Sequence, residues 1–488
     1  MGDDEQLTGS AGLPAGRAVA LDERVRIWRD ASVVLGGAPW GILRIAAAAR
    51  PFVGRLKDAG AAGLVPSPGL ERAVVDMLLP RGIVHPLPTH DHQLDSGVEV
   101  VVPAYERPEL LDTCLTALRA DSPQMHIIVV DDASPSAAVS AVARAHGATL
   151  IRHPVNRGPA AARNTGLDAV TAPIVAFVDA DCSVTPGWLD PLVAHFDDPR
   201  VAAVAPRIRP RSKSSNALPR YEFTRSALDM GPRPELVAPG APLGYLPSAT
   251  LLIRRKALGS LVFDEDLRFG EDVDLVWRLS DAGWMVRYEP TSIVTHEIRP
   301  KLFDWARRHF DYGSSAAPLD VRHPRRLAPA RWSVWNLAVG LIVLARRPTR
   351  GLAAAAGLGV AGLSTALLAR RLSASSVSPA VAPLVIGKGL VADTAATGHL
   401  LRREWWPLGW LVLATAPRSR LGRFAAAAML IPLAAEWFTR RPRLDPARYV
   451  ALRLSEDAAY GSGVIASAIA DKRPAVLLPM VRMPGGRR

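Results

Sequence analysis

Between about residues 97 and 300, short apolar runs alternate with segments of helical periodicity. Continuous Val- and Ile-rich runs predict buried strands, whereas apolar positions repeated every three or four residues predict helices. In chain order we expect strand 98–105, helix 108–120, strand 126–134, helix 136–147, strand 148–153, helix 158–170 and strand 173–183. This alternation is typical of an α/β fold, with a parallel sheet covered on both faces. Ligands bind such sheets beyond the carboxyl ends of their strands.

Residues 18–88 have a different pattern, which predicts a small separate module. Two short alternating runs predict a hairpin, and two amphipathic helices and a short strand should follow it. These elements are the hairpin 24–28 and 32–37, the helices 42–56 and 70–82, and the strand 83–88. The β-β-α-α-β outline has the size of a winged-helix module. The polar stretch 89–97 then predicts a linker.

The third pattern, at about 330–443, consists of apolar runs separated by arginines. Segment 351–369 has nineteen uncharged residues and is the best candidate for a membrane span. Arginines flank both of its ends, against the positive-inside tendency, so interfacial helices or a re-entrant hairpin fit better. We therefore expect a membrane-associating helical region at 301–443 and a poorly ordered tail at 444–488.

The charge of the chain supports a membrane surface as partner and argues against nucleic acid. The formal net charge is +13, and residues 326–443 carry sixteen Lys and Arg against three acids, a difference of thirteen. The rest of the chain is therefore close to neutral, and no zinc-finger or RNA-binding signature occurs. Only two cysteines occur, Cys114 and Cys182, which fits a reducing cytosol. The polar N-terminus lacks the features of a signal peptide, so we expect the cytoplasmic face of the membrane.

The motif Asp179–Asp181 directly follows the apolar run IVAFV, residues 174–178. Mg²⁺ and Mn²⁺ prefer oxygen ligands, often one or two carboxylates together with substrate phosphates. Two carboxylates at i and i+2 of a strand end can reach a metal ion and a ribose together. A solvated turn is the competing interpretation, because two acids in this spacing are common.

Further polar residues sit where a nucleotide-sugar donor would be bound. Asp131 and Asp132 end another strand, where carboxylates can accept hydrogen bonds from a nucleobase and a ribose. Arg157, Arg163 and Asn164 surround a helix start, and both guanidinium groups and free helix N–H groups favour a diphosphate. Simple solvated positions on the helix would explain these arginines equally well.

Glu271 and Asp272 open an amphipathic helix after a glycine. Acids in a first helical turn often serve as helix-dipole partners. In an enzyme, one of this pair could instead take a proton from an acceptor hydroxyl. His296 ends a β-like run and is either structural or a third metal ligand beside Asp179 and Asp181.

The order and spacing of these motifs resemble family 2 glycosyltransferases of the GT-A fold. The matching segments are VVVPAYERPELLDTCLTAL, IIVVDDASP, NRGPAAARNTGL, VAFVDADCSVTPGWL and GEDVDLVWRLSDAGW. The resemblance implies an inverting hexosyltransferase that uses a UDP-sugar with Mg²⁺ or Mn²⁺. It implies that Asp131 or Asp132 binds the nucleobase, Asp179 the ribose and Asp181 the metal, with Asp272 as base and Glu271 beside it. The first segment adds Pro103, Tyr105 and Glu106 to the expected donor-binding set.

The chain departs from the general family in two places. The usual glycine-rich lead into FDE is LVFDEDL here, and the QxxRW signature of processive synthases is absent, which argues against a polysaccharide polymerase. The whole layout resembles the glycosyltransferases of mycofactocin systems, which attach glucose to a peptide-derived precursor. In that resemblance residues 18–88 are a PqqD-like module that binds the peptide-derived acceptor. A lipid-carrier or cell-envelope acceptor, and a scaffold that only binds nucleotide sugars, remain alternatives.

Overall fold

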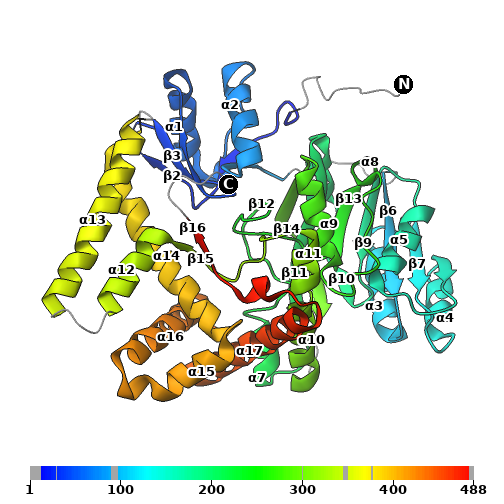
Figure 1. Ribbon diagram of the computed structural model, residues 1–488. Coiled ribbons are helices and arrows are strands. Elements are labelled where there is room, and N and C mark those ends of the chain that lie inside the picture. The colour runs from blue at the N-terminus through cyan, green and yellow to red at the C-terminus, as the bar shows by residue number, and fades with distance from the viewer. Residues whose placement is uncertain are drawn as a thin grey trace. The chain divides into compact units, whose positions relative to one another are not determined.

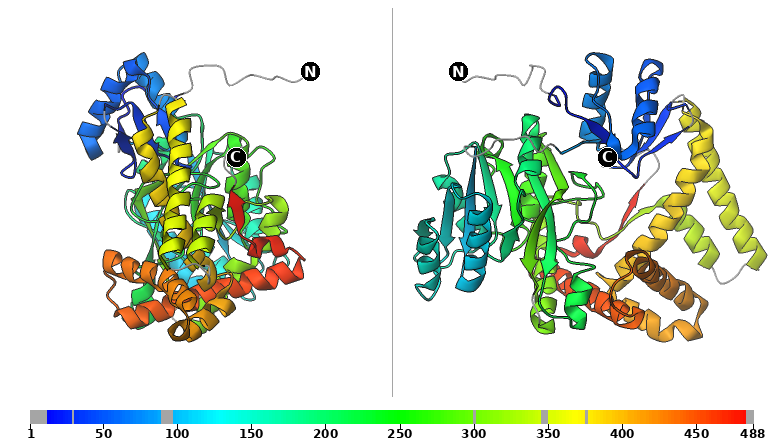
Figure 2. Two further views of the ribbon diagram at one scale, coloured as in Figure 1. Left: turned by 60° about the vertical axis from the view of Figure 1, so that its left-hand side comes forward. Right: turned by 180° about the vertical axis from the view of Figure 1, so that it is seen from behind.

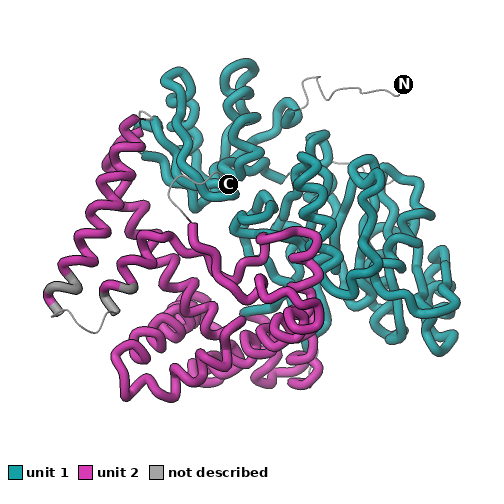
Figure 3. Tube along the Cα trace, in the orientation of Figure 1, with its two compact units in different colours: residues 1–213, 225–298 teal, residues 214–224, 299–488 magenta. Residues whose placement is uncertain are grey.

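The computed structural model describes residues 12–28, 30–88, 97–298, 301–344, 350–374 and 377–482. The chain forms two compact units (Figure 3): unit 1 comprises residues 1–213 and 225–298, and unit 2 comprises residues 214–224 and 299–488. The expected N-terminal module and catalytic region therefore share unit 1. The acidic N-terminus and nearly all of the expected linker 89–97 lie outside the described residues.

The N-terminal module combines two small sheets with two helices (Figure 1). One sheet pairs β1 (Val19–Leu21) with β5 (Val84–Pro86), and the other contains β2 (Arg26–Trp28), β3 (Val33–Gly36) and β4 (Gly41–Arg44). The apolar faces of α1 (Arg50–Ala59) and α2 (Leu70–Leu78) pack into one core with these strands. The predicted hairpin is confirmed as β2–β3, and the second helix and the last strand are also confirmed.

The expected helix over 42–56 is wrong in its first part. Ile42 and Leu43 lie in β4 opposite Leu35 and Val34 of β3, and α1 begins only at Arg50. A short apolar run has no periodicity of its own, so pairing with a neighbouring strand decides its conformation.

The large sheet of unit 1 has the strand order β10-β14-β11-β13-β9-β6-β7-β8, with β12 paired to β14. Its parallel half confirms the four strands predicted between residues 98 and 183. These strands are β6 (Val98–Ala104), β7 (Ile127–Asp131), β8 (Thr149–Arg152) and β9 (Ile174–Val178). The helices between them also agree with the prediction: α3 (Pro108–Asp121), α4 (Ala138–Ala145) and α5 (Pro159–Ala169).

The other half of the sheet is mixed, which corrects the expectation of a parallel sheet. β13 runs antiparallel to both β9 and β11, and β10 and β12 run antiparallel to β14. Hydrogen bonding between distant segments decides these directions, and no local pattern encodes it. The bounds are β10 (Cys182–Val184), β11 (Val201–Arg211), β12 (Glu235–Val237), β13 (Thr250–Arg254) and β14 (Met285–Glu297). Short helices α6 (Asp190–Val193) and α8 (Arg255–Leu258) and the longer α9 (Glu271–Asp281) complete this half.

Unit 2 is built from helices, which begin with α7 and resume after the large sheet (Figure 1). The helices are α7 (Ala217–Glu222), α10 (Leu302–Ser314), α11 (Ala316–Arg322), α12 (Val334–Leu344), α13 (Arg350–Ala374), α14 (Ala382–Arg402), α15 (Trp406–Thr415), α16 (Arg420–Arg440) and α17 (Pro446–Ala470). Two short strands, β15 (Arg331–Ser333) and β16 (Met480–Arg482), pair in parallel. The expectation of a poorly ordered tail is wrong for its described residues, because Pro446–Ala470 form α17, which packs against α10.

Small residues allow α10 and α17 to approach closely. A Cβ added at Gly313 would lie 2.0 Å from the Tyr460 carbonyl oxygen, and one at Gly463 would lie 2.0 Å from that of Phe310. Both distances are far below contact, so only glycine fits at these two positions.

The apolar C-terminal region forms helices of several lengths. α12 and α13 pack side by side as a hairpin, which Figure 2 shows in both views, and segment 351–369 lies within α13. Among the described residues, two other helical stretches, Pro379–Arg402 and Arg420–Arg440, are long and apolar enough to cross a membrane by length and composition alone. Whether these helices could cross a bilayer or lie at its surface depends on how they pack within unit 2.

Candidate active site

The centre of the candidate site is the turn that follows β9. All five residues of this strand are buried, and the Asp179 N–H donates to the Ala249 carbonyl 2.8 Å away, beside β13. Asp179–Asp181 therefore lies at the carboxyl end of a central strand, as the sequence predicted. The Asp179 side chain remains 30% exposed, so it can meet a ligand.

Arg163 connects this turn with the start of α9. Its Nη2 lies 2.7 Å from Asp179 Oδ1, and its Nη1 lies 2.8 Å from Glu271 Oε1. The guanidinium is almost fully buried, with its carbon 5.5 Å from the centre of the Phe263 ring. The arginine expected to meet a donor diphosphate is thus held between two of the other predicted site residues. Its two carboxylate partners raise its pKa against the effect of burial.

Close packing places Arg163 at this position. A Cβ at Gly166, on the same helix, would lie 2.3 Å from a methyl group of Val101 in β6. Because residue 166 is a glycine, α5 can lie directly on the sheet. Arg163 is then within reach of the carboxyl end of β9, the strand that follows α5.

α9 begins with the two acids expected to include the base. Gly270 adopts a left-handed conformation with φ of 84° and ends the preceding loop. Asp272 accepts hydrogen bonds from the backbone N–H groups of Ser248, at 3.1 Å, and Val273, at 2.8 Å. Asp272 is partly exposed, whereas Glu271 is buried against Arg163.

Burial changes the acidity of both carboxyl groups. It raises the pKa of Glu271 to about 7, and the adjacent Asp272 charge adds to the rise while Arg163 opposes it. It also raises the pKa of Asp272, against the hydrogen bonds from Ser248 and Val273. Raised carboxyl pKa values in a site suit proton transfer near neutral pH.

Asp181 and His296 form the candidate metal pair. β10 pairs with β14 so that Cys182 stands opposite His296, and His296 Nε2 lies 3.3 Å from Asp181 Oδ2. In the described part of the chain no three His, Cys, Asp or Glu side chains gather closely enough to hold an ion by themselves. A carboxylate and an imidazole that leave other positions open fit an Mg²⁺ or Mn²⁺ ion whose remaining ligands are substrate phosphates and water.

The two acids at the end of β7 are buried and bonded within the protein. Asp131 accepts hydrogen bonds from the Ser134 N–H and the Ser140 hydroxyl. Asp132 accepts from the N–H groups of Arg157 and Gly158, at 2.9 and 2.8 Å. Asp132 also lies 2.7 Å from the His153 ring. These contacts hold the loop before α5 against the end of β7.

The other expected donor residues surround the same strand ends. Pro103 lies in β6 opposite Val130, Tyr105 follows that strand and is 47% exposed, and the Glu106 N–H donates to the Ser134 hydroxyl. Arg157 forms an exposed ion pair with Glu265. The Asn164 amide exchanges hydrogen bonds with the Phe263 backbone and donates to Glu265.

Sequence reasoning missed the residues that hold this site through their backbones. Ser248 fixes Asp272, and Gly244 accepts a hydrogen bond from the Trp277 indole, so α9 holds the loop before β13 at two points. No motif marks either position, because backbone groups do the binding. His153, which contacts Asp132, could have been noticed as a polar residue at the end of β8.

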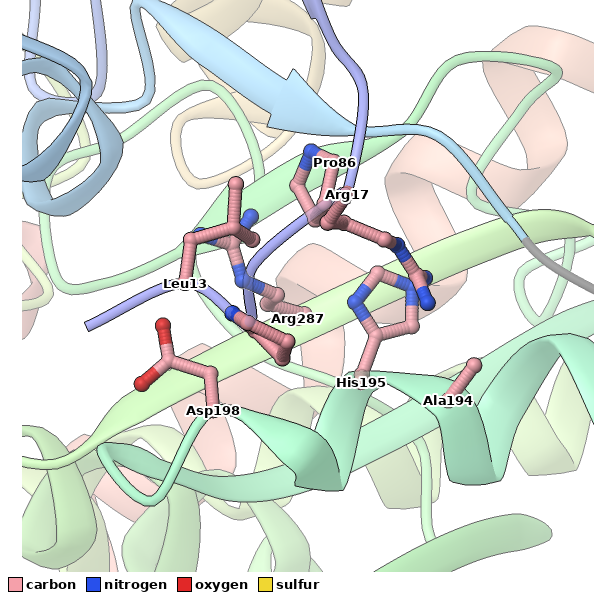
Figure 4. Close-up of a pocket in the computed structure, with 8 residues that line it drawn as sticks. Leu13, Arg17, Pro86, Ala194, His195, Asp198 and Arg287 are labelled. Carbon is pink, nitrogen blue, oxygen red and sulfur yellow. The ribbon is translucent and has the colours of Figure 1, made fainter. Parts of the chain in front are cut away.

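A small pocket elsewhere in unit 1 contains none of the expected site residues (Figure 4). It lies where the start of the module meets the catalytic part, and its lining residues are Leu13, Pro14, Arg17, Pro86, Ala194, His195, Asp198 and Arg287. Two of its polar side chains already bind neighbours, since His195 contacts Glu289 and Asp198 contacts Arg200. We therefore keep the strand ends of the large sheet as the candidate active site.

The family description "Glycosyl transferase family 2" matches residues 99–261, which include most of the site just described. A pre-mycofactocin glycosyltransferase of Mycobacterium tuberculosis is 36% identical over 482 residues, covering 96% of this chain and 99% of that protein. The chain belongs to glycosyl transferase family 2. This family 2 chain is a glycosyltransferase with a GT-A fold, as its motifs predicted.

Two further similarities are more distant from this family 2 chain. Glycosyltransferase AglE of Haloferax volcanii is 26% identical over 214 residues, 42% of this chain and 67% of that protein. Mannosyltransferase PcManGT from Pyrobaculum calidifontis, solved in complex with GDP-Man and Mn2+, shares 18% identity over 79% of this chain and 89% of its own, with a TM-score of 0.43.

Proposed function

We propose that the protein transfers glucose from UDP-glucose to a peptide-derived acceptor in mycofactocin biosynthesis, with inversion at the anomeric carbon. The observation that carries the proposal is the 36% identity to a pre-mycofactocin glycosyltransferase along nearly the whole of both chains. A match of this length includes the N-terminal module and the helical region, which general family 2 enzymes need not share.

In the proposed reaction, Asp272 accepts the proton of the acceptor hydroxyl. The oxygen then bonds to the anomeric carbon while the bond to the diphosphate breaks, and UDP leaves with that electron pair. The partly exposed Asp272 suits this role better than Glu271, which Arg163 holds in a buried ion pair. Arg163 keeps the start of α9 and the Asp179 turn together, so that base and donor stay aligned.

The donor site comprises the strand ends with Tyr105, Asp179 and the loop that Asp132 holds. We assign the metal to Asp181 and His296, with Asp179 directed to the ribose or the metal. A divalent ion bound there would neutralise charge that develops on the leaving diphosphate. The remaining predicted donor residues are Pro103, Glu106, Asp131, Arg157, Arg163 and Asn164.

In this proposal, the other parts of the chain bind the acceptor and place the enzyme at the membrane. The module at 18–88 binds the peptide-derived acceptor, and the helical region holds the enzyme at the cytoplasmic face of an anionic membrane. Exposed apolar side chains on α15 and α16 also favour a lipid-carrier acceptor as the second candidate, because such a surface could hold a lipid tail.

Mass spectrometry of the products tests the proposal. The full-length protein is incubated with UDP-glucose, Mn²⁺ and either the peptide-derived precursor or a polyprenyl phosphate. We expect the precursor to gain one or more hexoses, and EDTA or Asp181→Ala to abolish the gain without unfolding the protein. Transfer to the polyprenyl phosphate alone would identify the second candidate, and full activity in EDTA would contradict the metal assignment.

A further inference from the structure

An apolar surface in unit 2 has no partner in the described structure: α15 and the first half of α16. Two helices joined by a short turn carry it, shown in orange in Figure 1. Large side chains along both helices are between 47% and 59% exposed: Leu408, Trp410, Leu411, Leu421 and Phe424. Water-exposed apolar side chains gathered on neighbouring segments mark a surface that binds something apolar.

The charge around this surface has one sign. Residues 405–435 contain three basic residues, Arg418, Arg420 and Arg423, and no Asp or Glu. All three arginines are exposed and lie at the turn and the first helical turn of α16. Exposed apolar side chains beside basic residues, with no acidic residues among them, are complementary to a membrane surface, where anionic headgroups lie above the acyl chains.

The middle of α16 is tied to buried charges, which argues against a spanning helix. Met429, at its midpoint, is fully buried, and its carbonyl accepts a hydrogen bond from Arg402 at 2.6 Å. The same arginine contacts Asp457 at 3.0 Å, and Arg453 also binds Asp457. If α16 crossed a bilayer, this network would lie near the centre of the hydrocarbon, where charged groups are costly.

The second half of α16 is held in the same way. Glu436 lies near Arg453 of α17, and the Trp437 indole donates to the Leu444 carbonyl. Ile431 and Phe438 of this half are exposed as well, but of the two helices only α15 and residues 420–428 lack such ties to buried charges. Those nine residues extend about 13 Å along the helix axis, and α15, with ten residues, extends about 15 Å, against roughly 30 Å of hydrocarbon.

We propose that α15 and residues 420–428 form an interfacial hairpin, which enters one leaflet of an anionic membrane and does not cross it. Leu408, Trp410, Leu411, Leu421 and Phe424 enter the acyl boundary, and Arg418, Arg420 and Arg423 bind lipid phosphates. The inference rests on the membrane association proposed above and specifies its lipid class, its depth and the residues that make it.

Flotation with vesicles tests the hairpin in the full-length protein. Vesicles of phosphatidylcholine alone are compared with vesicles that contain phosphatidylglycerol, at low and at high salt. We expect binding to the anionic vesicles, release by high salt or alkaline carbonate, and little binding to neutral ones. R420E/R423E should weaken the partition at least about 30-fold, since each surface arginine contributes roughly fivefold.

Matched variants separate the hairpin from general effects of charge and apolarity. K472E/R473E changes the charge equally at exposed positions after α17, and L302S/F303S removes an exposed apolar pair on α10. Both should bind vesicles as the wild type does, whereas W410S/L411S should bind at least tenfold more weakly. Equal binding by the hairpin and control variants would overturn the proposal.

Two further outcomes would also overturn it. Resistance to both salt and carbonate would indicate spanning helices, and a dimer that W410S/L411S dissociates without vesicles would show that a second copy covers the surface. Transfer to a soluble acceptor is measured in each variant. A hairpin variant that loses vesicle binding but keeps full transfer activity tests the hairpin alone. If the wild type transfers no sugar, the proposed function is refuted, but the vesicle-binding result still holds.

Discussion

At the scale of single residues, Arg163 has the most consequential environment. Together with Arg157 and Asn164, it lies near the start of a helix, and the sequence predicted that it would face a diphosphate. The structure places it between Asp179 and Glu271, with both contacts shorter than 3 Å. A buried cation shared by these two carboxylates links the candidate metal turn to the start of α9, where the candidate base follows Glu271.

Asp272→Asn tests the base assignment at this scale. We expect kcat to fall about 10²–10⁴-fold, the usual loss for a general base, with UDP-glucose affinity by calorimetry nearly unchanged. In the wild type the rate should rise with pH, because Asp272 must be ionised and burial raises its pKa. Asp266→Asn, in the loop before α9, is the control and should keep its rate. Normal turnover in Asp272→Asn, or failure only through lost donor binding, would show that another group is the base.

Glu271→Gln tests the buried acid through stability. The folded pKa of about 7 exceeds the usual 4.5, so the contribution of Glu271 is fully present below pH 4.5 and is lost as pH rises through 7. The free energy of unfolding of Glu271→Gln, relative to wild type, should therefore increase by about 3 kcal/mol between pH 4.5 and 8.

Denaturant unfolding at several pH values measures this difference. Glu109→Gln, at an exposed position in the first turn of α3, provides the comparison and should show no such trend. A difference that is constant with pH would mean that Glu271 titrates as in the unfolded chain.

At the scale of elements, glycines set the distance between α10 and α17. Gly463→Ala should lower the free energy of unfolding by about 1–3 kcal/mol, because its Cβ would meet the Phe310 carbonyl at 2.0 Å. Gly387→Ala, on α14, has open space around the new Cβ and should raise stability by about 0.5–1 kcal/mol through helix propensity. Thermal or denaturant unfolding compares the two, and similar effects of both would contradict the close approach.

At the scale of the molecule, ion pairs join the N-terminal module to the catalytic part of unit 1. Arg24 lies 2.6 Å from Glu235, whose side chain is 9% exposed, and it also contacts Asp22. A second pair, Arg233 with Glu23, joins the same parts but is exposed. We expect the two pairs to contribute differently to the free energy of unfolding, mainly because they differ in burial and less because of their distances.

Glu235→Ala should therefore destabilise the protein by about 1–3 kcal/mol, the cost of removing a hydrogen bond to a charged group. Glu23→Ala should cost less than about 1 kcal/mol, as is usual for exposed pairs. Chemical unfolding followed by tryptophan fluorescence measures both variants. Equal losses would show that the buried pair does not hold the module in place.

The sequence alone determined the parallel half of the sheet and the candidate acids, because buried strands and amphipathic helices have local periodicities. It also placed Asp179, Asp181 and Glu271 at element ends, where adjacent polar residues follow apolar runs. Family resemblance, confirmed by the long match, supplied the reaction class.

Only the tertiary structure decided which side chains meet. The β4 conformation of residues 42–44 depends on pairing with the neighbouring strand β3. The antiparallel strand β13 and the helix in the expected tail depend on contacts with segments far away in the chain. The same is true of Arg163 between its two acids, of Ser248 on Asp272, and of Arg402 on the middle of α16. Local patterns encode burial and conformation, whereas these contacts come from packing between distant segments, which a single sequence does not display.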